Sequence, residues 1–308
     1  MRGRDVLSIA DLSPDEVQTI LRTALSLKRD GGGGDLLAGK TLAMIFEKPS
    51  LRTRVSFEVA MGQLGGRAIY LNQAEVGLGQ REPVSDVARV LSRYVDVIAA
   101  RTYSHQTLLE LARYADVPVI NALSDEEHPC QALADLLTVL EKRGTLRGIR
   151  LAYVGDGFNV AASLAEASAL SGVHLTIASP EGYHLPDHVL RLVQRLASEN
   201  AARVDVCQTP ADAVRGADVV YTDVWTSMGQ EDSYTDRKEA FAGYTITADL
   251  MALAKPDAIF MHDLPAHRGE EVAADVIEGP QSVVFDQAEN RLHAQKAILA
   301  LIASGQAL

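Results

Sequence analysis

Residues 47–54 bring two hydroxyl side chains, Ser50 and Thr53, close to two guanidinium groups, Arg52 and Arg54. They follow an apolar run and precede a helical pattern, so they would begin a helix. The free N–H groups and positive dipole end of a helix start favour anions, and guanidinium forks suit phosphate oxygens. The segment predicts a phosphate cradle, although a capped helix with solvated arginines is the alternative. It is not a P-loop, because the GxxxxGK[ST] pattern is absent.

Three further residues of the first half could join this chemistry. Arg101 directly follows a strand-like run, which would place a cation at the same sheet edge; taken alone it could be a surface arginine. His128 and Gln131 open a long helical pattern and could donate hydrogen bonds to a carbonyl or amide group, or could pack the helix start. Cys130 has no evident basic partner, which favours a packing role over a nucleophile.

The second half also carries polar groups just after strand-like runs. Asn159 lies at a helix start, where it could contact a ligand or cap the helix. The third glycine of a dinucleotide fingerprint is replaced by Val160, which disfavours a nicotinamide cofactor. Asp223 opens a loop that holds the only tryptophan, Trp225, and its carboxylate could hold an ammonium group. The alternative is a surface loop around a packed tryptophan.

A last cluster lies in residues 262–271, where His262 and His267 stand among acidic residues. The helical HExxH spacing is absent, which disfavours a metal site. A polar turn that binds substrate is the better interpretation. We therefore expect neither a cofactor nor a metal ion.

Alternating apolar runs and helical patterns predict an α/β protein with two doubly wound parallel-sheet domains and helices on both faces. The predicted strands are residues 41–46, 68–71, 95–100, 117–120, 150–154, 174–178, 203–206, 218–222 and 258–261. The predicted helices are residues 14–27, 52–64, 83–94, 105–114, 131–143, 159–171, 186–200 and 286–304. The pattern restarts after Gly144–Gly148, which predicts domains of residues 1–145 and 146–285. A C-terminal helix, within residues 286–308, would pack back on the first domain.

Composition restricts the class of protein. The chain has 308 residues with 41 acidic and 29 basic side chains, a net charge of -12. Such acidity disfavours nucleic acid and anionic membranes as partners, but not a local basic pocket. Two cysteines, Cys130 and Cys207, cannot build a disulfide framework. Neither a signal-peptide core nor an apolar run near ~20 residues is present, so we expect a soluble cytoplasmic protein.

Taken together, these segments resemble the aspartate/ornithine transcarbamylase family over essentially the whole chain. Residues 50–54 are similar to its carbamoyl-phosphate loop, Ser-x-Arg-Thr-Arg, and Arg101 and residues 128–131 to its other carbamoyl-phosphate contacts. Two segments, residues 223–229 and 267–271, resemble ornithine-type members. The first contains Ser-Met-Gly at residues 227–229, a loop that aspartate-type members lack.

The resemblance implies transfer of the carbamoyl group of carbamoyl phosphate to the δ-amine of L-ornithine, giving L-citrulline and phosphate, in arginine metabolism, such as arginine biosynthesis. The implied carbamoyl-phosphate ligands are Ser50, Leu51, Arg52, Thr53, Arg101, His128, Gln131, Leu264 and Arg291. The implied ornithine ligands are Asn159, Asp223, Ser227 and Met228. Catalytic roles are implied for Arg101, His128 and Asp263. The implied assembly is a homo-oligomer, a trimer or a multiple of trimers.

Two positions depart from the family pattern. Asp263 stands where the family usually has cysteine, and Phe158 where it often has asparagine. A carboxylate at 263 could orient an ammonium group and help to deprotonate it if its pKa is raised. Two alternatives stay open: a transcarbamylase for another amine, such as putrescine or an acylated ornithine, and a ligand-binding paralogue without turnover. Biosynthetic and catabolic use are both open.

Overall fold

The computed structural model describes residues 1–227 and 230–304. The chain forms two compact units, Met1–Leu137 with Glu289–Leu308, and Thr138–Ala288. The division falls inside α6 (Pro129–Arg143), several residues before residue 145, near which we expected a boundary inside or just after this helix. Because α6 is continuous across this point, no break in the helical pattern marks the division. Across the described ranges, no helix is long and apolar enough to cross a membrane.

The first unit is built on a parallel sheet of strand order β2-β1-β3-β4. Its strands are β1 (Thr41–Phe46), β2 (Arg67–Asn72), β3 (Val97–Arg101) and β4 (Val119–Leu123). All residues of β1 and β3 are buried, as expected for central strands covered on both faces. Burial on both faces explains why these strands appear in the sequence as continuous apolar runs. A strand exposed on one face would alternate apolar and polar residues instead.

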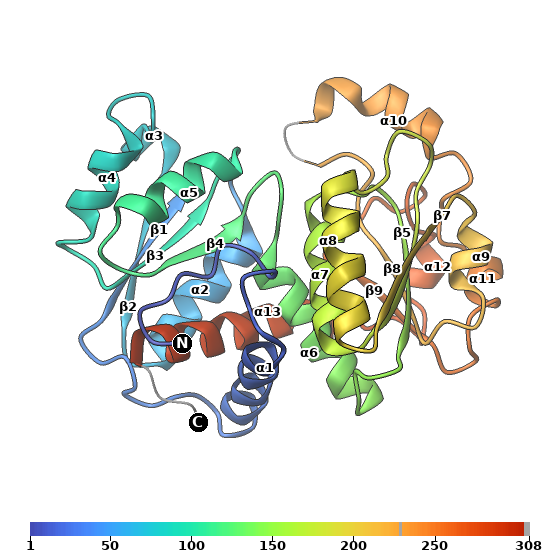
Figure 1. Cartoon of the computed structure of the whole chain (residues 1–308), viewed down its shortest axis with the longest axis horizontal. Coiled ribbons are helices and arrows are strands. Elements are labelled where there is room, and N and C mark those ends of the chain that lie inside the picture. Colours follow the sequence, from blue (N-terminus) through green and yellow to red (C-terminus); the bar gives the residue numbers. More distant parts are fainter. Residues whose placement is uncertain (228–229, 305–308) are drawn as a thin grey trace. The chain divides into compact units, whose positions relative to one another are not determined.

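Helices cover both faces of this sheet (Figure 1). They are α1 (Pro14–Arg29), α2 (Leu51–Gln63), α3 (Gln73–Val76), α4 (Val84–Leu91), α5 (His105–Tyr114) and α13 (Val284–Leu299). Apolar side chains of α4 and α5 share one core with β1, β3 and β4. Helix α13 lies beside α2, because Lys296 donates a 2.8 Å hydrogen bond to Gln63. The prediction that the C-terminal helix packs back on the first domain is confirmed.

The second unit holds a five-stranded parallel sheet of order β7-β6-β5-β8-β9. Its strands are β5 (Arg150–Val154), β6 (His174–Ala178), β7 (Arg203–Cys207), β8 (Val219–Thr222) and β9 (Ile259–His262). Chain order turns back at β5, which is therefore a topological switch point. In such sheets, ligands bind outside the carboxyl ends of the strands.

Helices also cover both faces of the second sheet (Figure 1). They are α7 (Asn159–Ser171), α8 (Asp187–Glu199), α9 (Pro210–Val214), α10 (Tyr234–Ala240), α11 (Ala248–Met251) and α12 (Ala274–Ile277), with a 3-10 turn at Glu231–Ser233. We predicted α7 and α8 but not the short helices α3 and α9–α12. A helix of four to seven residues has too few turns to show a period of 3.6. The predicted α/β class with two doubly wound sheets is confirmed.

Candidate active site

The phosphate cradle predicted in the first unit begins at the helix start of α2. Ser50 is its N-cap residue and accepts a hydrogen bond from the Thr53 N–H at 3.3 Å. The Ser50 hydroxyl also donates to the Thr53 hydroxyl at 3.0 Å. No acidic side chain stands in the first turn of the helix, so the positive dipole end is left for an anion. Leu51 is 76% exposed, so only its backbone N–H suits this cradle.

Arg291 joins the C-terminal helix to this cradle. It is buried and donates to the Thr53 hydroxyl at 3.0 Å and to the Gln131 side-chain oxygen at 2.6 Å. Gln131 in turn donates to Asp135 at 2.8 Å. The predicted residues Thr53, Gln131 and Arg291, which come from three distant helices, therefore form one hydrogen-bonded chain. Such a chain fixes each donor before a ligand arrives.

Arg101 and His128 come from the ends of the two neighbouring strands. Arg101 is the last residue of β3, at a register irregularity, and His128 precedes α6 after β4. Both side chains are buried. Burial, followed by the charges of Arg291, Arg101 and Arg52, holds the pKa of His128 well below its usual value. His128 is therefore neutral at pH 7 and can donate a hydrogen bond without adding a fourth positive charge.

Cys130 lies beside this cluster but takes no chemical part in it. Burial raises the pKa of its thiol to about 12, and its Sγ donates to the Asn121 carbonyl oxygen at 3.4 Å. A thiol is a nucleophile only when it is ionised. Burial and the raised pKa agree with the predicted packing role of Cys130.

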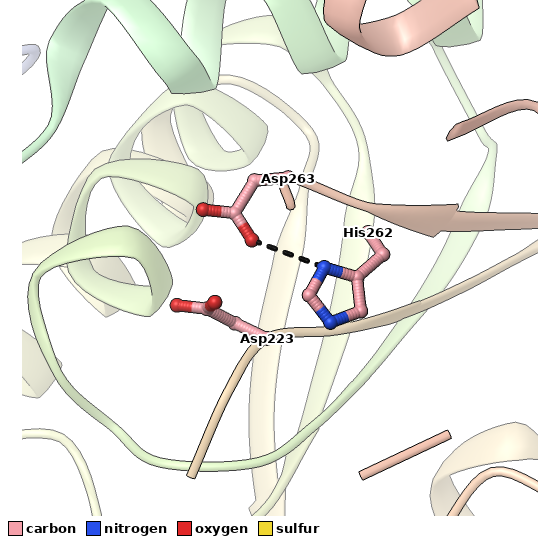
Figure 2. A group of neighbouring side chains, drawn as sticks. All are labelled: Asp223, His262 and Asp263. Atoms are coloured by element: carbon pink, nitrogen blue, oxygen red, sulfur yellow. Dashed lines mark ion pairs between the residues drawn. The ribbon is translucent and has the colours of Figure 1, made fainter. Parts of the chain in front are cut away.

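The second unit brings Asp223 and Asp263 together at the carboxyl ends of β8 and β9 (Figure 2). Carboxylate oxygens of both, together with a His262 nitrogen, lie within 4.8 Å of one another. Burial, the charge of Asp263 and a hydrogen bond with Asp263 raise the pKa of Asp223 well above its usual value. Burial and the neighbouring carboxylate therefore favour the protonated form of Asp223.

His262 links this carboxyl pair to a second buried acid. Its Nδ1 lies 3.4 Å from Asp263 Oδ1, and its Nε2 lies 3.1 Å from Oε1 of the fully buried Glu271. Burial lowers the pKa of His262, but hydrogen bonds and charges from Asp263 and Glu271 outweigh it and raise the pKa above its usual value. The two acids on either side of the imidazole therefore favour its protonated form.

Leu264 has an unusual backbone conformation next to this histidine. Its φ is 60°, in the left-handed region that branched side chains rarely adopt. Its N–H donates to His262 Nδ1 at 2.9 Å, which holds it there. Such local strain is typical of functional sites, where the surrounding structure imposes it.

The predicted ornithine ligands come from two loops of the same edge. Asn159 is buried in the first turn of α7, which follows β5, and its side-chain oxygen accepts the Val160 N–H at 2.8 Å. Ser227 follows β8, four residues after Asp223, and its N–H donates to the Gln230 side chain at 3.1 Å. Met228, the fourth predicted ligand, lies outside the described residues.

Two carboxylate and histidine groups have spacings that could hold a metal ion: Asp223, His262 and Asp263, and His267, Glu270 and Glu271. In the first group both histidine nitrogens already contact protein groups, Leu264 N–H and Glu271. In the second, Glu271 Oε1 accepts the His267 N–H and contacts His262. Internal contacts of this kind suit proton chemistry better than metal ligation.

Comparison with known proteins places both halves in one family. Residues 4–141 match the model described as aspartate/ornithine carbamoyltransferase, carbamoyl-P binding domain. Residues 147–302 match the Asp/Orn binding domain of the same family. The chain belongs to the aspartate/ornithine carbamoyltransferase family.

Relatives within this family are similar over almost the entire chain. An ornithine carbamoyltransferase of Pyrococcus abyssi is 54% identical over 308 residues, 99% of this chain and 97% of the relative. The anabolic ornithine carbamoyltransferase of Pyrococcus furiosus is also 54% identical, over 99% of this chain and 98% of the relative. A solved structure of ornithine carbamoyltransferase from Pyrococcus furiosus matches with a TM-score of 0.96 at 54% identity, over 99% of this chain and 98% of that chain.

Sequence reasoning gave no role to several residues that organise this carbamoyltransferase. Glu271 stood within the segment that we singled out, but nothing in its spacing indicated that it would contact His262. Arg237 and Asp156 form a buried ion pair at 2.5 Å, although 81 residues separate them. A single sequence contains no signal for such a pair.

Proposed function

We propose that this chain is an ornithine carbamoyltransferase that converts carbamoyl phosphate and L-ornithine to L-citrulline and phosphate. The observation that carries the proposal is a division of charge. The first unit has three arginines around a neutral histidine, and the second has a buried carboxyl pair. One suits a phosphate and the other an ammonium group, which are the charges of the two substrates.

In the first unit, Ser50, Arg52 and Thr53 bind the phosphate group, together with the Leu51 N–H and Arg291. They stabilise the charge that grows on phosphate as the carbon–oxygen bond breaks. Gln131 contacts the carbamoyl amide, and Leu264 of the second unit is a further proposed ligand of the carbamoyl group.

Arg101 and His128 donate to the carbonyl oxygen of carbamoyl phosphate and stabilise its negative charge during attack. The depressed pKa of His128 matters here, because a neutral imidazole donates without repelling the neighbouring arginines. Preorganised donors of this kind are each worth roughly 10²- to 10³-fold in rate.

In the second unit, Asp223, Asn159, Ser227 and Met228 bind the amino-acid end of ornithine. Asp263 takes a proton from the δ-ammonium group, whose nitrogen lone pair then attacks the carbonyl carbon. The protonated form of His262, favoured by its raised pKa, keeps Asp263 ionised until it takes this proton. The carbon–oxygen bond to phosphate breaks, phosphate leaves with its electron pair, and the second proton that the attacking nitrogen must lose goes to the departing phosphate.

Three alternatives place different demands on this site. An acylated ornithine has lost its α-ammonium charge, so a pocket with two buried acids suits it less than free ornithine. Putrescine has two ammonium groups but no carboxylate, so it would leave without a partner any hydrogen-bond donor that binds the carboxylate of ornithine. A paralogue without turnover would not need the strained Leu264 or the linked His262.

We further propose that the chain works in the cytoplasm as a homo-oligomer, a trimer or a multiple of trimers. An apolar stripe on one face of α2 supports self-association: Leu51, Val55 and Val59 are four residues apart, and each is at least 39% exposed. Both cysteines are free thiols, as a reducing compartment favours. Sedimentation of the purified protein tests the assembly, and Val55→Glu should dissociate it.

The direct test of function is formation of ureido product from carbamoyl phosphate with ornithine, putrescine, N-acetylornithine or aspartate in turn. We expect turnover with ornithine, at a kcat/KM at least about 100-fold above the other amines. Preference for another amine would identify one of the rivals. Binding of a phosphate ligand without turnover of any amine would identify a paralogue.

A further inference from the structure

Arg237, on the short helix α10, contacts three separate loops of the second unit. Its Nη1 lies 2.5 Å from Asp156 Oδ2, in the loop after β5. The same nitrogen donates to the Trp225 carbonyl oxygen at 2.9 Å, in the loop after β8. Its guanidinium carbon lies 5.0 Å from the ring centre of Tyr183, in the loop after β6. One side chain thus connects loops that follow three neighbouring strands.

Two of these loops, those after β5 and β8, carry the proposed ornithine ligands. Asp156 precedes Asn159 by three residues, and Trp225 lies between Asp223 and Ser227. A shift of either loop moves the ligands it carries. Arg237 itself is none of the proposed ligands, so it would act on the substrate only through the residues it holds.

The contact is built as a buried structural joint. The side chains of Arg237 and Asp156 are only 11% and 10% exposed. Burial raises the pKa of Asp156, and the hydrogen bond and charge of Arg237 oppose this rise. Buried ion pairs are costly to desolvate and are not by themselves evidence for stability. We therefore assign this pair a positional effect: it fixes the loop after β5 relative to helix α10.

Aromatic side chains connect the Arg237 contact to the side chain of Trp225. The Trp225 ring stacks on Phe241 with centroids 5.5 Å apart, and Phe241 also contacts Tyr183 at 5.0 Å. Tyr183 is the ring beneath Arg237. The guanidinium, Tyr183, Phe241 and Trp225 therefore form one packed group, so the fluorescence of Trp225, the only tryptophan of the chain, should respond to the loss of Arg237.

Helix α10 also contacts the loop after β9. Tyr234 donates a hydrogen bond to Glu270, and Lys238 pairs with the same carboxylate at 3.4 Å. Glu270 is the neighbour of Glu271, which contacts His262. Helix α10 thus contacts four loops at the carboxyl edge of the sheet, and those after β5, β8 and β9 carry proposed residues of the amine site.

We propose that Arg237 is a positioning residue for the amine site, which holds the loops of Asn159 and Asp223 at the spacing that ornithine requires. This inference rests on the proposed function. Its consequence is selective: loss of Arg237 raises the KM for ornithine but leaves the KM for carbamoyl phosphate unchanged, since the ligands of the phosphate belong to the first unit.

The test compares Arg237→Met with a matched variant, Arg143→Met. Arg143 is 16% exposed and pairs with the buried Asp218 at 3.2 Å in the same unit, but Asp218 precedes β8 and lies at the opposite end of that strand. Both variants lose a buried arginine–carboxylate pair. Only Arg237→Met should raise the KM for ornithine, by about tenfold to a hundredfold, and Arg237→Lys should recover part of the loss.

Trp225 fluorescence gives a readout independent of turnover. Arg237→Met should change its emission maximum and its quenching by acrylamide, while Arg143→Met should leave both unchanged. Equal KM changes in the two variants, or a raised KM for ornithine without any change in Trp225, would overturn the proposal. Absence of ornithine turnover in the unaltered protein would overturn the proposed function instead, and the fluorescence comparison would then still test whether Arg237 holds this loop.

Discussion

Replacing Arg291 by methionine separates ligand binding from folding in the first unit. The wild-type side chain is 3% exposed and contacts Thr53 and Gln131. Methionine keeps much of the apolar volume but has no charge and no N–H donor. We expect carbamoyl phosphate to bind far more weakly, while the free protein remains folded.

The two effects differ in size. Leaving the Gln131 oxygen without its donor costs about 1–3 kcal/mol of folding free energy, but removing one of three neighbouring arginine charges relieves repulsion and offsets part of it. For binding, a cation about 4 Å from a phosphate charge is worth up to ~4 kcal/mol at an effective dielectric of 20. With partial compensation by Arg52 and Arg101, a loss of about 2–4 kcal/mol corresponds to roughly 30- to 700-fold in affinity.

The assay is calorimetric titration with a stable phosphonate analogue of carbamoyl phosphate, together with thermal unfolding of the free protein. Lys296→Met is the control, because Lys296 is also buried on α13 and bonds to a glutamine, Gln63, outside the phosphate cradle. An affinity of Arg291→Met within twofold of wild type, or an equal loss in Lys296→Met, would refute the reasoning.

The same variant tests the electrostatics of His128. The charge of Arg291 is the second largest cause, after burial, of its depressed pKa. In Arg291→Met the pKa of His128 should therefore rise toward its usual value, which NMR titration of the imidazole resonances can follow. An unmoved titration would contradict the proposed closeness of these charges.

Three other substitutions follow from the site. Arg52→Ala should abolish turnover and weaken carbamoyl-phosphate binding, and near-normal steady-state kinetics would remove Arg52 from the site. Asp263→Cys should keep ornithine turnover but move the acid limb of the pH–rate profile to lower pH, because a neutral thiol no longer raises the pKa of Asp223; an unchanged profile would exclude Asp263 from the chemistry. Cys130→Ser should keep wild-type kcat, since a thiol with a pKa of about 12 is not ionised at pH 7, and a large fall in kcat with an intact fold would show otherwise.

The sequence predicted the parts of the fold that depend on local pattern. All nine predicted strands are present among the described residues, with some ends shifted by a few residues. Segments β1, α5, β5, β6 and α7 have the predicted limits. Gly155 directly follows β5, and Asn159 begins α7, which ends just before Gly172. Short helices such as α11 were missed, since four residues have no detectable period.

The candidate site was predictable only where its residues share a short segment. Ser50 and Thr53 lie three apart on one helix start, so their contact follows from helix geometry. The contact between Asp223 and Asp263 depends on β8 and β9 being neighbours, which is a fact of sheet order. Arg237 and Asp156 meet through two loops, and no local rule of chain geometry relates such positions.

The pKa of His128 is lowered and that of His262 is raised. This difference depends on the fold and cannot be read from the composition. Both are buried, and burial alone would lower the pKa of each. Arginines from α2, β3 and α13 lower that of His128 further, whereas Asp263 and Glu271 reverse the effect at His262. The acidic excess of the chain predicts neither outcome, because each pKa depends on which distant charges the fold brings within a few ångströms. Separate acid and base roles at one pH follow from such paired environments, so a neutral donor and a proton acceptor can be made from the same residue type.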